Sequence, residues 1–499
     1  MRLSQIFHQL DEVVEQRGPL DADVTDVVCD SRQVVPGCVF VALPGEHADG
    51  RQFVAAAVAA GAVAVVAEDR VDAGDADVAV IQVRKAARAL ARLADVLYDR
   101  PCDTLKLVGV TGTNGKTTTT FLIHHLMVCA WHRAGMLGTV LYDDGIACRP
   151  ADRTTPQSHD VHRMLAAMRD NGCRGAVMEV SSHGLAQERV ADLRFDAAIF
   201  TNLTQDHLDY HGTMEEYYKA KERLASILAA QRAAGGKDAL LAVNTDDVHG
   251  QRMVRDFTGR VRLTTFGFGA RCDFRALRME TGVRGTTFAL AAKGREFLVK
   301  LPLIGRFNVY NTMGALAAAD ALEFNFREAI QNVANAPQVP GRLERVIEHG
   351  PYRVFVDYAH TPDALASVLA TLRELKPARI ITVFGCGGDR DREKRPMMGR
   401  IASQMSDVCV VTSDNPRSEE PAAILREIEA GISARNYRVV EDRREAIGMA
   451  IHLAGDGDVV LVAGKGHEDY QEAKGVKSPF DDRVEVRRAD RERREGGGA

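Results

Sequence analysis

Short apolar runs separated by helical stretches recur along the whole chain. Near the N-terminus, the runs at residues 39–43 and 62–67 predict buried strands, and the stretch at residues 53–60 between them predicts a helix. The polar turn Asp99-Arg100-Pro101 then interrupts the pattern and is a candidate linker. The pattern therefore predicts a small α/β domain over residues 1–100.

The same alternation continues over residues 101–338, where a helical stretch starts near Thr117. Strands that alternate with helices form a parallel sheet with helices on both faces. Ligands of such sheets bind beyond the carboxyl ends of the strands, so the polar residues after each strand are the candidates for function. The predicted strands of this second domain lie at residues 105–110, 176–180, 197–200 and 239–243.

A third α/β domain, with a second Rossmann-like pattern, is predicted over residues 339–499, after the turn Val339-Pro340-Gly341. The last stretch, residues 487–499, is charged and then glycine-rich, and we expect it to be frayed. The predicted strands are at residues 354–356, 380–384, 408–411 and 459–462, and each ends in a polar or glycine-rich segment. The predicted fold class is therefore α/β, with three domains.

Composition limits the classes of function. Hydrophobic residues make up 45% and charged residues 27% of the chain, as in ordinary globular proteins. A net charge of −5 argues against nucleic acid or an anionic membrane as a partner. No apolar run reaches the roughly 20 residues that span a bilayer, and the N-terminus lacks the apolar core of a signal peptide. The nine cysteines are scattered without a CxxC pair, which suits a reducing compartment. We expect a soluble, monomeric protein of the cytoplasm.

The strongest local motif follows the first predicted strand of the second domain and reads Gly112-Thr113-Asn114-Gly115-Lys116-Thr117-Thr118. In this context, glycines let backbone N–H groups approach phosphates, and the start of the helix adds a favourable dipole. Lys116 is expected to reach the β- and γ-phosphates, and Thr117 to offer its hydroxyl to Mg²⁺. The strict Walker pattern has glycine where this chain has Val110. The motif nevertheless predicts an ATP-binding phosphate loop.

Candidate cation ligands follow the next two predicted strands. Glu179 stands at the tip of one strand and could hold Mg²⁺ together with Thr117. His207 lies in the polar segment after the other strand and could hold a second cation. An isolated loop histidine is more often a surface residue than a ligand, but a place beyond a strand of the phosphate-loop domain favours ligation.

Nine motifs occur in order over nearly the whole chain: GTNGKTTTT, MEVSSHGL, TNLTQDHLDYHG, FNVYNTMGALA, GRLE, VDYAHTPDAL, GCGGDRDREKRP, SDNPR and AGKGHE. Together they closely resemble the Mur ligases, the ATP-dependent amide ligases of bacterial cell-wall synthesis. The phosphate loop of that family commonly reads GTxGKT, so Val110 is ordinary there. The resemblance implies that a carboxylate is phosphorylated and that an amine then attacks the acyl phosphate. It is strongest with the branch that adds meso-2,6-diaminopimelate to the D-Glu side chain of UDP-N-acetylmuramoyl-L-Ala-D-Glu.

The resemblance also implies roles at the ATP site. Thr117 and Glu179 would hold one Mg²⁺ and His207 a second, with Lys221 carrying a CO₂-derived carbamate that supplies anionic oxygens. Without the family's spacing, Lys221 would be an ordinary solvated lysine like Lys219. The implied catalytic set is Lys116, Glu179, His207 and Lys221, and the implied further nucleotide contacts are Asn308 and Asn311 near adenine, Arg342 at the γ-phosphate after domain closure, and Asp357 at the ribose.

The resemblance assigns the remaining candidates to the two other substrates. For the UDP-linked dipeptide, it implies Ser31, the backbone at Glu46, His47 and Ala48, and also Thr154, Thr155, Ser181, Gln187 and Arg189. For diaminopimelate, it implies Asp414-Asn415-Pro416-Arg417, with Arg390, Gly464 and Glu468. The chemistry agrees, because an arginine fork binds the distal carboxylate of diaminopimelate but would face only an ammonium if lysine were bound.

Three other interpretations stay open. The first is another ligase of the same kind, such as a lysine-adding or folylpolyglutamate-type enzyme. The second is a P-loop NTPase that uses ATP as a conformational switch, and the third is a catalytically silent protein that binds a UDP-sugar. Formation of an amide in step with ADP and phosphate distinguishes a ligase from the other two.

Overall fold

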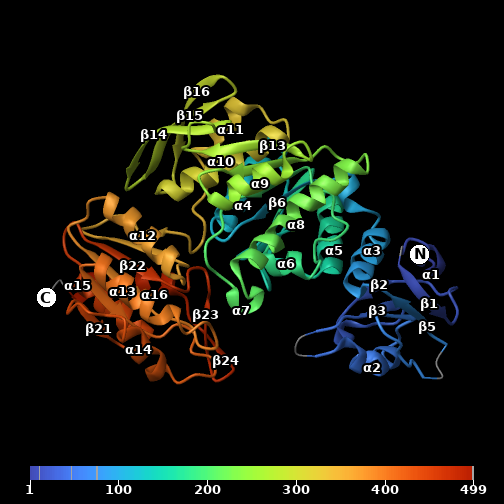
Figure 1. Cartoon of the computed structure of the whole chain (residues 1–499). Coiled ribbons are helices and arrows are strands. Elements are labelled where there is room, and N and C mark those ends of the chain that lie inside the picture. The colour runs from blue at the N-terminus through green and yellow to red at the C-terminus, as the bar shows by residue number, and fades with distance from the viewer. Residues whose placement is uncertain (11, 46–47, 75–76, 497–499) are drawn as a thin grey trace.

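The computed structural model describes residues 1–10, 12–45, 48–74 and 77–496, so Glu46 and His47 lie outside the described residues. Three main sheets follow one another along the chain, one in each predicted domain range. Figure 1 shows the central unit between the N-terminal unit, in blue, and the C-terminal unit, in orange and red. The exact domain boundaries stay a prediction. Among the described residues, no helix is long and apolar enough to cross a membrane.

The N-terminal sheet has the strand order β1-β5-β4-β3-β2, and only β1 is antiparallel to its neighbour. The strands predicted at residues 39–43 and 62–67 are confirmed as β3 and β4, and the predicted helix as α2. The elements are α1 (Leu3–Phe7), β1 (Val13–Arg17), β2 (Asp26–Val28), β3 (Cys38–Ala42), α2 (Val54–Ala59), β4 (Ala64–Ala67), β5 (Ala79–Val83) and α3 (Ala86–Leu97).

The predicted linker joins α3 to the central sheet. Asp99 and Arg100 both have left-handed backbone conformations, with φ of 56° and 45°. Arg169 on the central unit donates hydrogen bonds from Nη1 to the carbonyls of Tyr98 and Asp99, at 3.2 and 3.1 Å. The fully buried Asp95 of α3 also accepts hydrogen bonds from both terminal nitrogens of the Arg194 guanidinium. These contacts fasten the N-terminal unit to the central unit.

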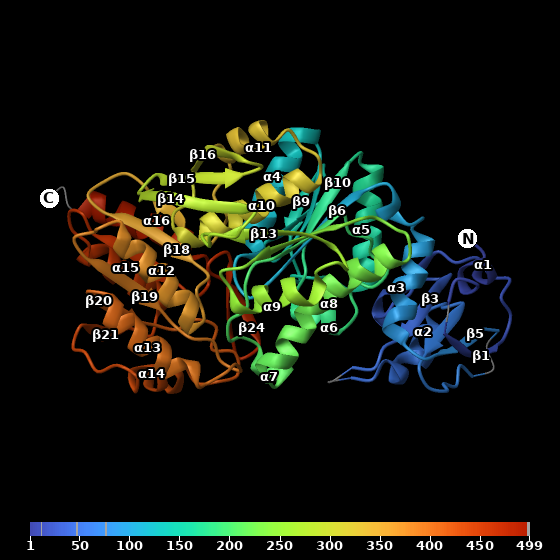
Figure 2. The ribbon, with the colours of Figure 1, turned by 45° about the horizontal axis from the view of Figure 1, so that its top comes forward.

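The central sheet has the order β16-β15-β14-β13-β12-β11-β6-β10-β7-β8-β9, and its middle strands are parallel. Figure 2 shows α4 and α10 on one side of this sheet and α8 and α9 on the other. The strands are β6 (Lys106–Thr111), β7 (Gly135–Leu137), β8 (Leu141–Asp143), β9 (Cys148–Pro150), β10 (Gly175–Glu179), β11 (Ala197–Phe200), β12 (Leu240–Asn244), β13 (Arg262–Gly267), β14 (Phe274–Gly282), β15 (Gly285–Ala292) and β16 (Arg295–Leu301).

The helices of the central unit pack two apolar cores against the sheet. Strand β6 lies between β10 and β11, so the carboxyl ends of these three strands meet at one edge. This arrangement brings the phosphate loop, Glu179 and the segment of His207 together, as the predicted parallel sheet requires. The helices are α4 (Lys116–Trp131), α5 (Ser158–Asp170), α6 (Ser182–Ala186), α7 (Leu208–His211), α8 (Met214–Ala233), α9 (Val248–Phe257), α10 (Arg306–Ala321) and α11 (Phe326–Val333).

The C-terminal sheet has the order β17-β18-β22-β19-β20-β21, with β17 antiparallel to the rest, and a separate hairpin pairs β23 with β24. The strands predicted at residues 380–384 and 408–411 have the observed bounds of β19 and β20. The elements are β17 (Glu344–Ile347), β18 (Arg353–Asp357), α12 (Pro362–Glu374), β19 (Ile380–Phe384), α13 (Lys394–Met405), β20 (Val408–Val411), α14 (Pro421–Glu429), β21 (Tyr437–Val439), α15 (Arg443–Leu453), β22 (Val459–Ala463), β23 (Tyr470–Ala473), β24 (Val476–Pro479) and α16 (Asp482–Gly496).

The prediction of a frayed tail from residue 487 onward is wrong for most of that stretch, because α16 extends to Gly496. The charged sequence hides an apolar face: Val486 and Ala489 are buried against the C-terminal core. Asp490 accepts a hydrogen bond of 2.6 Å from the hydroxyl of Tyr352, which fixes the helix further along. Residues 497–499 lie outside the described part of the chain.

Candidate active site

The phosphate loop runs from the end of β6 to the start of α4, and its two glycines have positive φ, 147° at Gly112 and 85° at Gly115. A Cβ at Gly112 would lie 1.9 Å from Oγ1 of Thr201, and one at Gly115 would lie 2.4 Å from Oδ1 of Asn311. Thr201 also donates a hydrogen bond of 2.6 Å to the carbonyl of Asn114. Only glycine therefore fits at these two positions, and β11 and α10 hold the loop in place.

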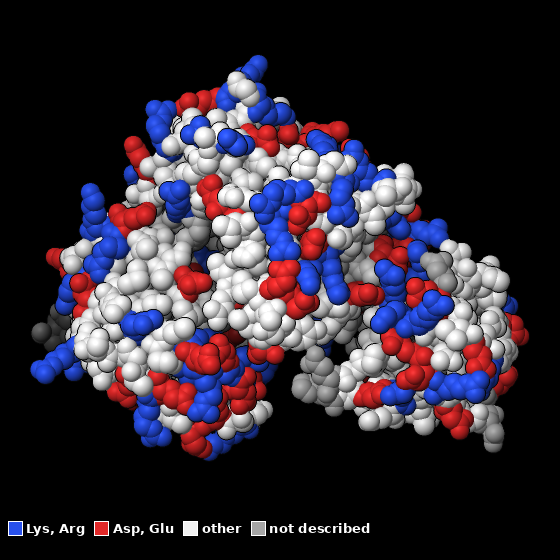
Figure 3. Space-filling view, viewed as in Figure 1, with Lys and Arg blue, Asp and Glu red and all other residues white. Residues whose placement is uncertain are grey.

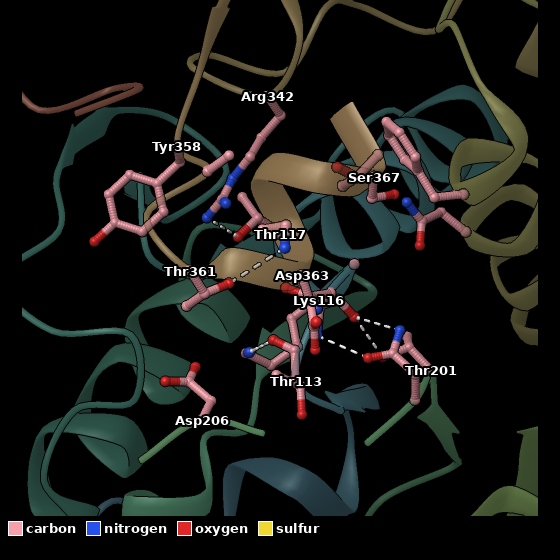
Figure 4. A pocket seen from close by; sticks show the side chains of 18 of the residues that line it. Thr113, Lys116, Thr117, Thr201, Asp206, Arg342, Tyr358, Thr361, Asp363 and Ser367 are labelled. Carbon is pink, nitrogen blue, oxygen red and sulfur yellow. Dashed lines mark hydrogen bonds between the residues drawn. The ribbon is translucent and has the colours of Figure 1, made fainter. Parts of the chain in front are cut away.

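Lys116 folds back over the loop that it follows. Its Nζ donates to the carbonyls of Gly112 and Thr113, at 3.0 and 2.8 Å. Burial lowers the pKa of Lys116, and the nearby carboxylates of Glu179 and Asp206 oppose that shift. Lys116 is thus close to the loop whose N–H groups would meet an anion, and Figure 4 shows it among the side chains that line the pocket.

Oxygen donors for a divalent cation meet beside the loop. Oγ1 of Thr117 donates a hydrogen bond of 3.0 Å to Oε2 of the buried Glu179. Thr139 holds the same carboxylate through its backbone N–H, at 2.8 Å, and its hydroxyl, at 3.0 Å. From the C-terminal unit, Nη2 of Arg342 donates to Oγ1 of Thr117 at 3.1 Å. A hydroxyl and a carboxylate so close together fit Mg²⁺, which prefers oxygen ligands.

His207 begins α7 with a left-handed backbone, φ 54°, and its Nε2 lies 3.5 Å from a carboxylate oxygen of Asp206. Burial lowers the pKa of His207 to about 4, so its ring is neutral near pH 7 and a nitrogen can bind a cation. Within the described residues, no three His, Cys, Asp or Glu side chains converge as a metal site. A second cation here would therefore need ligands of other kinds.

Lys221 on α8 is the least ordinary lysine of the site. Its side chain is 1% exposed, and its Nζ donates a hydrogen bond of 2.8 Å to the carbonyl of Gly112. The ammonium also lies 4.7 Å from the ring centre of Tyr217. Burial, and then the charge of Lys116, lower the pKa of Lys221 well below its usual value. Burial thus makes the charged form less favourable here than in an exposed lysine, and the ordinary interpretation of a solvated lysine does not apply to this residue.

A cavity of about 310 Å³ lies over the phosphate loop, between the central and C-terminal units. Asp357 is on its wall, with its carboxylate fixed by the N–H groups of Leu343 and Ala359. Of the two predicted asparagines, Asn311 lines the cavity. Asn308 lies behind Asn311, and its Oδ1 accepts a hydrogen bond of 3.0 Å from the side-chain amide of Asn311. The cavity brings together these predicted residues: Thr113, Asn114, Gly115, Lys116, Thr117, Thr118, Thr154, Glu179, Ser181, His207, Lys221, Asn311, Arg342 and Asp357.

Sequence reasoning missed several residues of this wall. Phe266 on β13, and Phe307 and Tyr310 on α10, supply flat apolar surface, and neither element carries a phosphate-binding motif. His360 comes from the C-terminal unit, and its position after β18 was the one available signal. The remaining polar lining residues without a predicted role are Thr139, Ser182, Thr201, Asn202, Asp206, Tyr217, Asn244, Tyr358, Thr361, Asp363 and Ser367, and Figure 4 labels Thr201, Asp206, Tyr358, Thr361, Asp363 and Ser367 among them.

A second and larger cavity, of about 1170 Å³, lies between the N-terminal and central units, and Ser31, Ala48 and Gln187 line it. Arg189 donates hydrogen bonds to the carbonyl of Thr155, at 2.9 Å, and to Oε1 of Gln187, at 2.5 Å. Basic residues that the sequence analysis did not single out also line this cavity: Arg32, Lys85, Arg149, Arg153, Arg163 and Arg223. Positive and negative side chains are interleaved over the face in Figure 3, so such local groups would provide the charge that holds an anion.

Thr155 lies in the chain between Thr154, which lines the first cavity, and Pro156, which lines the second. It is buried, its Oγ1 donates to the carbonyl of Glu179 at 2.9 Å, and it accepts from the N–H of Ser181 at 3.0 Å. Ser181 in turn caps α6 by accepting from the N–H of Gly184. The hydrogen bonds of Thr155 therefore hold its own segment against the end of β10, while Thr154 and Ser181 line the cavity over the phosphate loop.

The predicted amino-acid residues gather at the carboxyl ends of β20 and β22. Asn415 donates a hydrogen bond of 2.8 Å to Oε2 of Glu468 and accepts one of 2.9 Å from the buried Nζ of Lys465. Arg417 donates from Nη1 to the carbonyl of Gly388 at 2.8 Å. A Cβ at Gly464 would lie 2.6 Å from a carboxylate oxygen of Asp414, so this position needs glycine.

Arg390 lies in the loop that faces this segment. A Cβ on Gly387 would lie 2.8 Å from the guanidinium of Arg417 and 3.9 Å from Cγ of Arg390. Both predicted arginines therefore lie next to Gly387. Pro416 belongs to the same segment, and its carbonyl packs against Gly388.

Comparison with known proteins gives one consistent result. Residues 23–98 match the model of the Mur ligase family catalytic domain, residues 110–319 the Mur ligase middle domain, and residues 341–466 the Mur ligase glutamate ligase domain. The chain is 44% identical over 498 residues to the UDP-N-acetylmuramoyl-L-alanyl-D-glutamate–2,6-diaminopimelate ligase of Geobacter metallireducens, covering 96% of each. It is 43% identical to the protein of that name from Listeria monocytogenes, covering 93% of this chain and 94% of the other. A solved structure of a ligase of the same name superposes with a TM-score of 0.70, at 33% identity and 99% coverage of both chains.

Proposed function

The chain belongs to the Mur ligase family, and from this premise we propose that it adds meso-2,6-diaminopimelate to the D-Glu side-chain carboxylate of UDP-N-acetylmuramoyl-L-Ala-D-Glu, with ATP. The Geobacter and Listeria relatives carry this activity in their names over nearly the same length. The single observation that carries the choice of amino acid is that Arg417 and Arg390 both lie next to Gly387, while Glu468 is held by Asn415, two residues before Arg417.

The phosphoryl step belongs to the cavity over the phosphate loop. A carboxylate oxygen of D-Glu attacks the γ-phosphorus, and ADP leaves. Lys116 and the loop's N–H groups hold the phosphates, while Arg342 reaches the same end of the cavity from the C-terminal unit. Mg²⁺ held by Thr117 and Glu179 would offset the repulsion between the two anions. Asp357 is placed to accept hydrogen bonds from the ribose hydroxyls, and Asn311 to contact adenine.

Lys221 would act as a carbamate. Its neutral amine can attack CO₂, forming an N–C bond and releasing one proton to solvent. The lowered pKa and the burial of Lys221 support this proposal, since an ammonium has no lone pair for the attack. The product is an anion beside Lys116 and His207, so the charge of Lys116 would attract it, and its oxygens would be available as ligands for a second Mg²⁺.

The acceptor would enter from the second cavity. Ser31 and the backbone near Ala48 face this cavity from the N-terminal unit, and Gln187 and Arg189 lie on the opposite side, where a diphosphate and peptide carboxylates need cations. The dipeptide would then extend past Thr155 toward Ser181 and the nucleotide. Glu46 and His47 remain assigned only by the sequence.

The amide forms in the second step. The amine of diaminopimelate attacks the acyl carbon, phosphate leaves, and the amine loses a proton. Arg417 and Arg390 would hold the distal carboxylate, and Glu468 would face an ammonium. Burial and the neighbouring Asp414 raise the pKa of Glu468, while Lys465 and Asn415 oppose that shift. A cation such as the substrate ammonium would therefore stabilise the ionised carboxylate.

Mass spectrometry of the product tests the proposal. The protein is incubated with ATP, the UDP-linked dipeptide, and equal amounts of diaminopimelate, lysine and glutamate. We expect only the diaminopimelate adduct, formed in step with ADP and phosphate. A lysine or glutamate adduct would support the other ligase interpretations, and ADP without an adduct would support an NTPase switch. We also propose that the protein is a cytoplasmic monomer with domains at residues 1–100, 101–338 and 339–499.

A further inference from the structure

Arg395, in the first turn of α13, is among the largest fully buried side chains of the described residues. Its Nη1 donates to Oε2 of Glu419 and to Oε2 of Glu427, at 2.9 and 2.8 Å. Its Nη2 donates to Oε1 of Glu419 at 2.7 Å and to the carbonyl of Gly387 at 3.2 Å. Arg395 thus joins an ion triad to the glycine loop between β19 and α13.

The same contacts fasten that loop to the segment that carries Arg417. Oε1 of Glu419 also accepts a hydrogen bond of 2.7 Å from the backbone N–H of Asp389. A second contact runs in the opposite direction, because Nη1 of Arg417 donates a hydrogen bond to the carbonyl of Gly388 in the glycine loop. Residues 387–390 and 415–419 are therefore closed into one ring, and Arg395 lies at its buried side.

The ring imposes two unusual backbone conformations. Asp389 and Arg417 have φ of 52° and 51°, in the left-handed region that non-glycine residues rarely adopt. Such conformations persist where the surrounding contacts impose them. Asp389 directly precedes Arg390, so the directions in which both arginines leave the backbone depend on this ring.

The side chain of Arg395 is buried, but those of Glu419 and Glu427 are 21% and 28% exposed. Ion pairs that reach solvent contribute about 0–1 kcal/mol each, so stability alone does not account for the triad. Two guanidinium groups that share one small pocket repel each other, and they bind a single carboxylate well only if other contacts fix their spacing.

We propose that Arg395 and Glu419 form a positioning clamp that sets the spacing of Arg390 and Arg417, and so selects an amino acid with a distal carboxylate. The inference rests on the proposed function. Neither residue of the clamp touches the substrate; both act through the two loops that they join.

The test compares Glu419→Gln and Arg395→Lys with the matched control Arg392→Ala. Arg392 pairs with Glu427 as well, but its side chain is 65% exposed. For each protein, kcat and KM are measured for diaminopimelate, ATP and the dipeptide, kcat/KM is measured for lysine, and thermal melting reports the fold.

Both clamp variants are expected to raise the KM for diaminopimelate by about tenfold or more, because small displacements of positioning groups have effects of this size. The preference for diaminopimelate over lysine should fall by a similar factor, with kcat, the KM for ATP and the KM for the dipeptide unchanged. Arg395→Met should show a larger loss than Arg395→Lys, and Arg392→Ala should behave as wild type.

A clamp variant that melts like wild type and keeps its KM and its preference overturns the inference. So does a parallel loss of kcat with every substrate, which indicates a structural role only. If one variant unfolds, the other decides between these outcomes. A wild-type protein that does not ligate diaminopimelate instead overturns the proposed function, and the two failures are thereby distinguished.

Discussion

Replacing Arg417 with alanine should remove most of the preference for diaminopimelate over lysine. The side chain is 21% exposed, and its Nη1 already donates to the carbonyl of Gly388, which leaves its other N–H groups for a ligand. The backbone should not move, because the N–H of Arg417 donates to the carbonyl of Glu472 and its carbonyl accepts from Lys474. The substitution therefore removes one cation, together with its hydrogen bond to the carbonyl of Gly388.

The size of the effect follows from the contacts. A hydrogen bond to a charged group contributes about 1.5–3 kcal/mol, which corresponds to roughly 10- to 150-fold in kcat/KM. A carboxylate of Glu472 lies 3.8 Å from Nε of Arg417 and partly compensates the guanidinium when no ligand carboxylate is present. For this reason we place the expected loss of preference inside that range and not above it.

The assay is kcat/KM for diaminopimelate and for lysine, in wild type, Arg417→Ala and the control Lys474→Ala. Lys474 is a neighbouring cation whose side chain is 77% exposed and pairs with Glu420. The control should keep the wild-type preference, and the KM values for ATP and dipeptide should stay the same in both variants. Equal use of lysine by the wild type, or full preference in Arg417→Ala, would show that this segment is only a turn.

Four further outcomes are expected. Lys116→Ala should abolish ligation without changing the thermal melting curve, since Nζ contacts only loop carbonyls; near-normal turnover would exclude the ATP assignment. Lys221→Ala should be nearly inactive and be partly restored by short carboxylates, and wild-type activity should fall when bicarbonate is removed; activity that is indifferent to all three changes would exclude the carbamate. Arg342→Ala should lower kcat, and small-angle scattering should show a change in wild-type dimensions on adding an ATP analogue and dipeptide; identical profiles would argue against domain closure. Arg443→Met should destabilise the protein by about 3–5 kcal/mol in urea unfolding, because it leaves the fully buried Asp482 without its partner; a loss below 1 kcal/mol would contradict this pairing.

The sequence was informative where one physical rule acts locally. Apolar runs located β19 and β20 to the residue, because strands buried on both faces are mostly apolar along their whole length. Ligands bind at the carboxyl ends of parallel strands, and this rule predicted that Glu179 and His207 lie near the phosphate loop. The structure confirms their position in the same cavity.

Contacts between distant segments were not accessible in the same way. The aromatic wall of Phe266, Phe307 and Tyr310 comes from two elements, β13 and α10, and nothing in their apolar patterns distinguishes it from core. The buried position of Arg395 depends on Glu419 and Glu427, which lie 24 and 32 residues further along the chain. The tail was misjudged because its charges outnumber the few apolar residues that α16 buries.

The hydrogen bond between Arg342 and Thr117 has a consequence for the timing of the reaction. One wall of the nucleotide cavity comes from the phosphate-loop unit, and the other, with Asp357 and Tyr358, comes from the unit that carries the amino-acid pocket. An acyl phosphate is lost if water reaches it before the amine does. Arg342 contacts the phosphate loop only when the unit that binds the amine is in place. The acyl phosphate would then form close to the amine and be exposed to water for a shorter time. Because both units form the walls of the cavity, ADP would leave once the two units separate. A small molecule that contacts both walls would hold the units together and so delay nucleotide exchange.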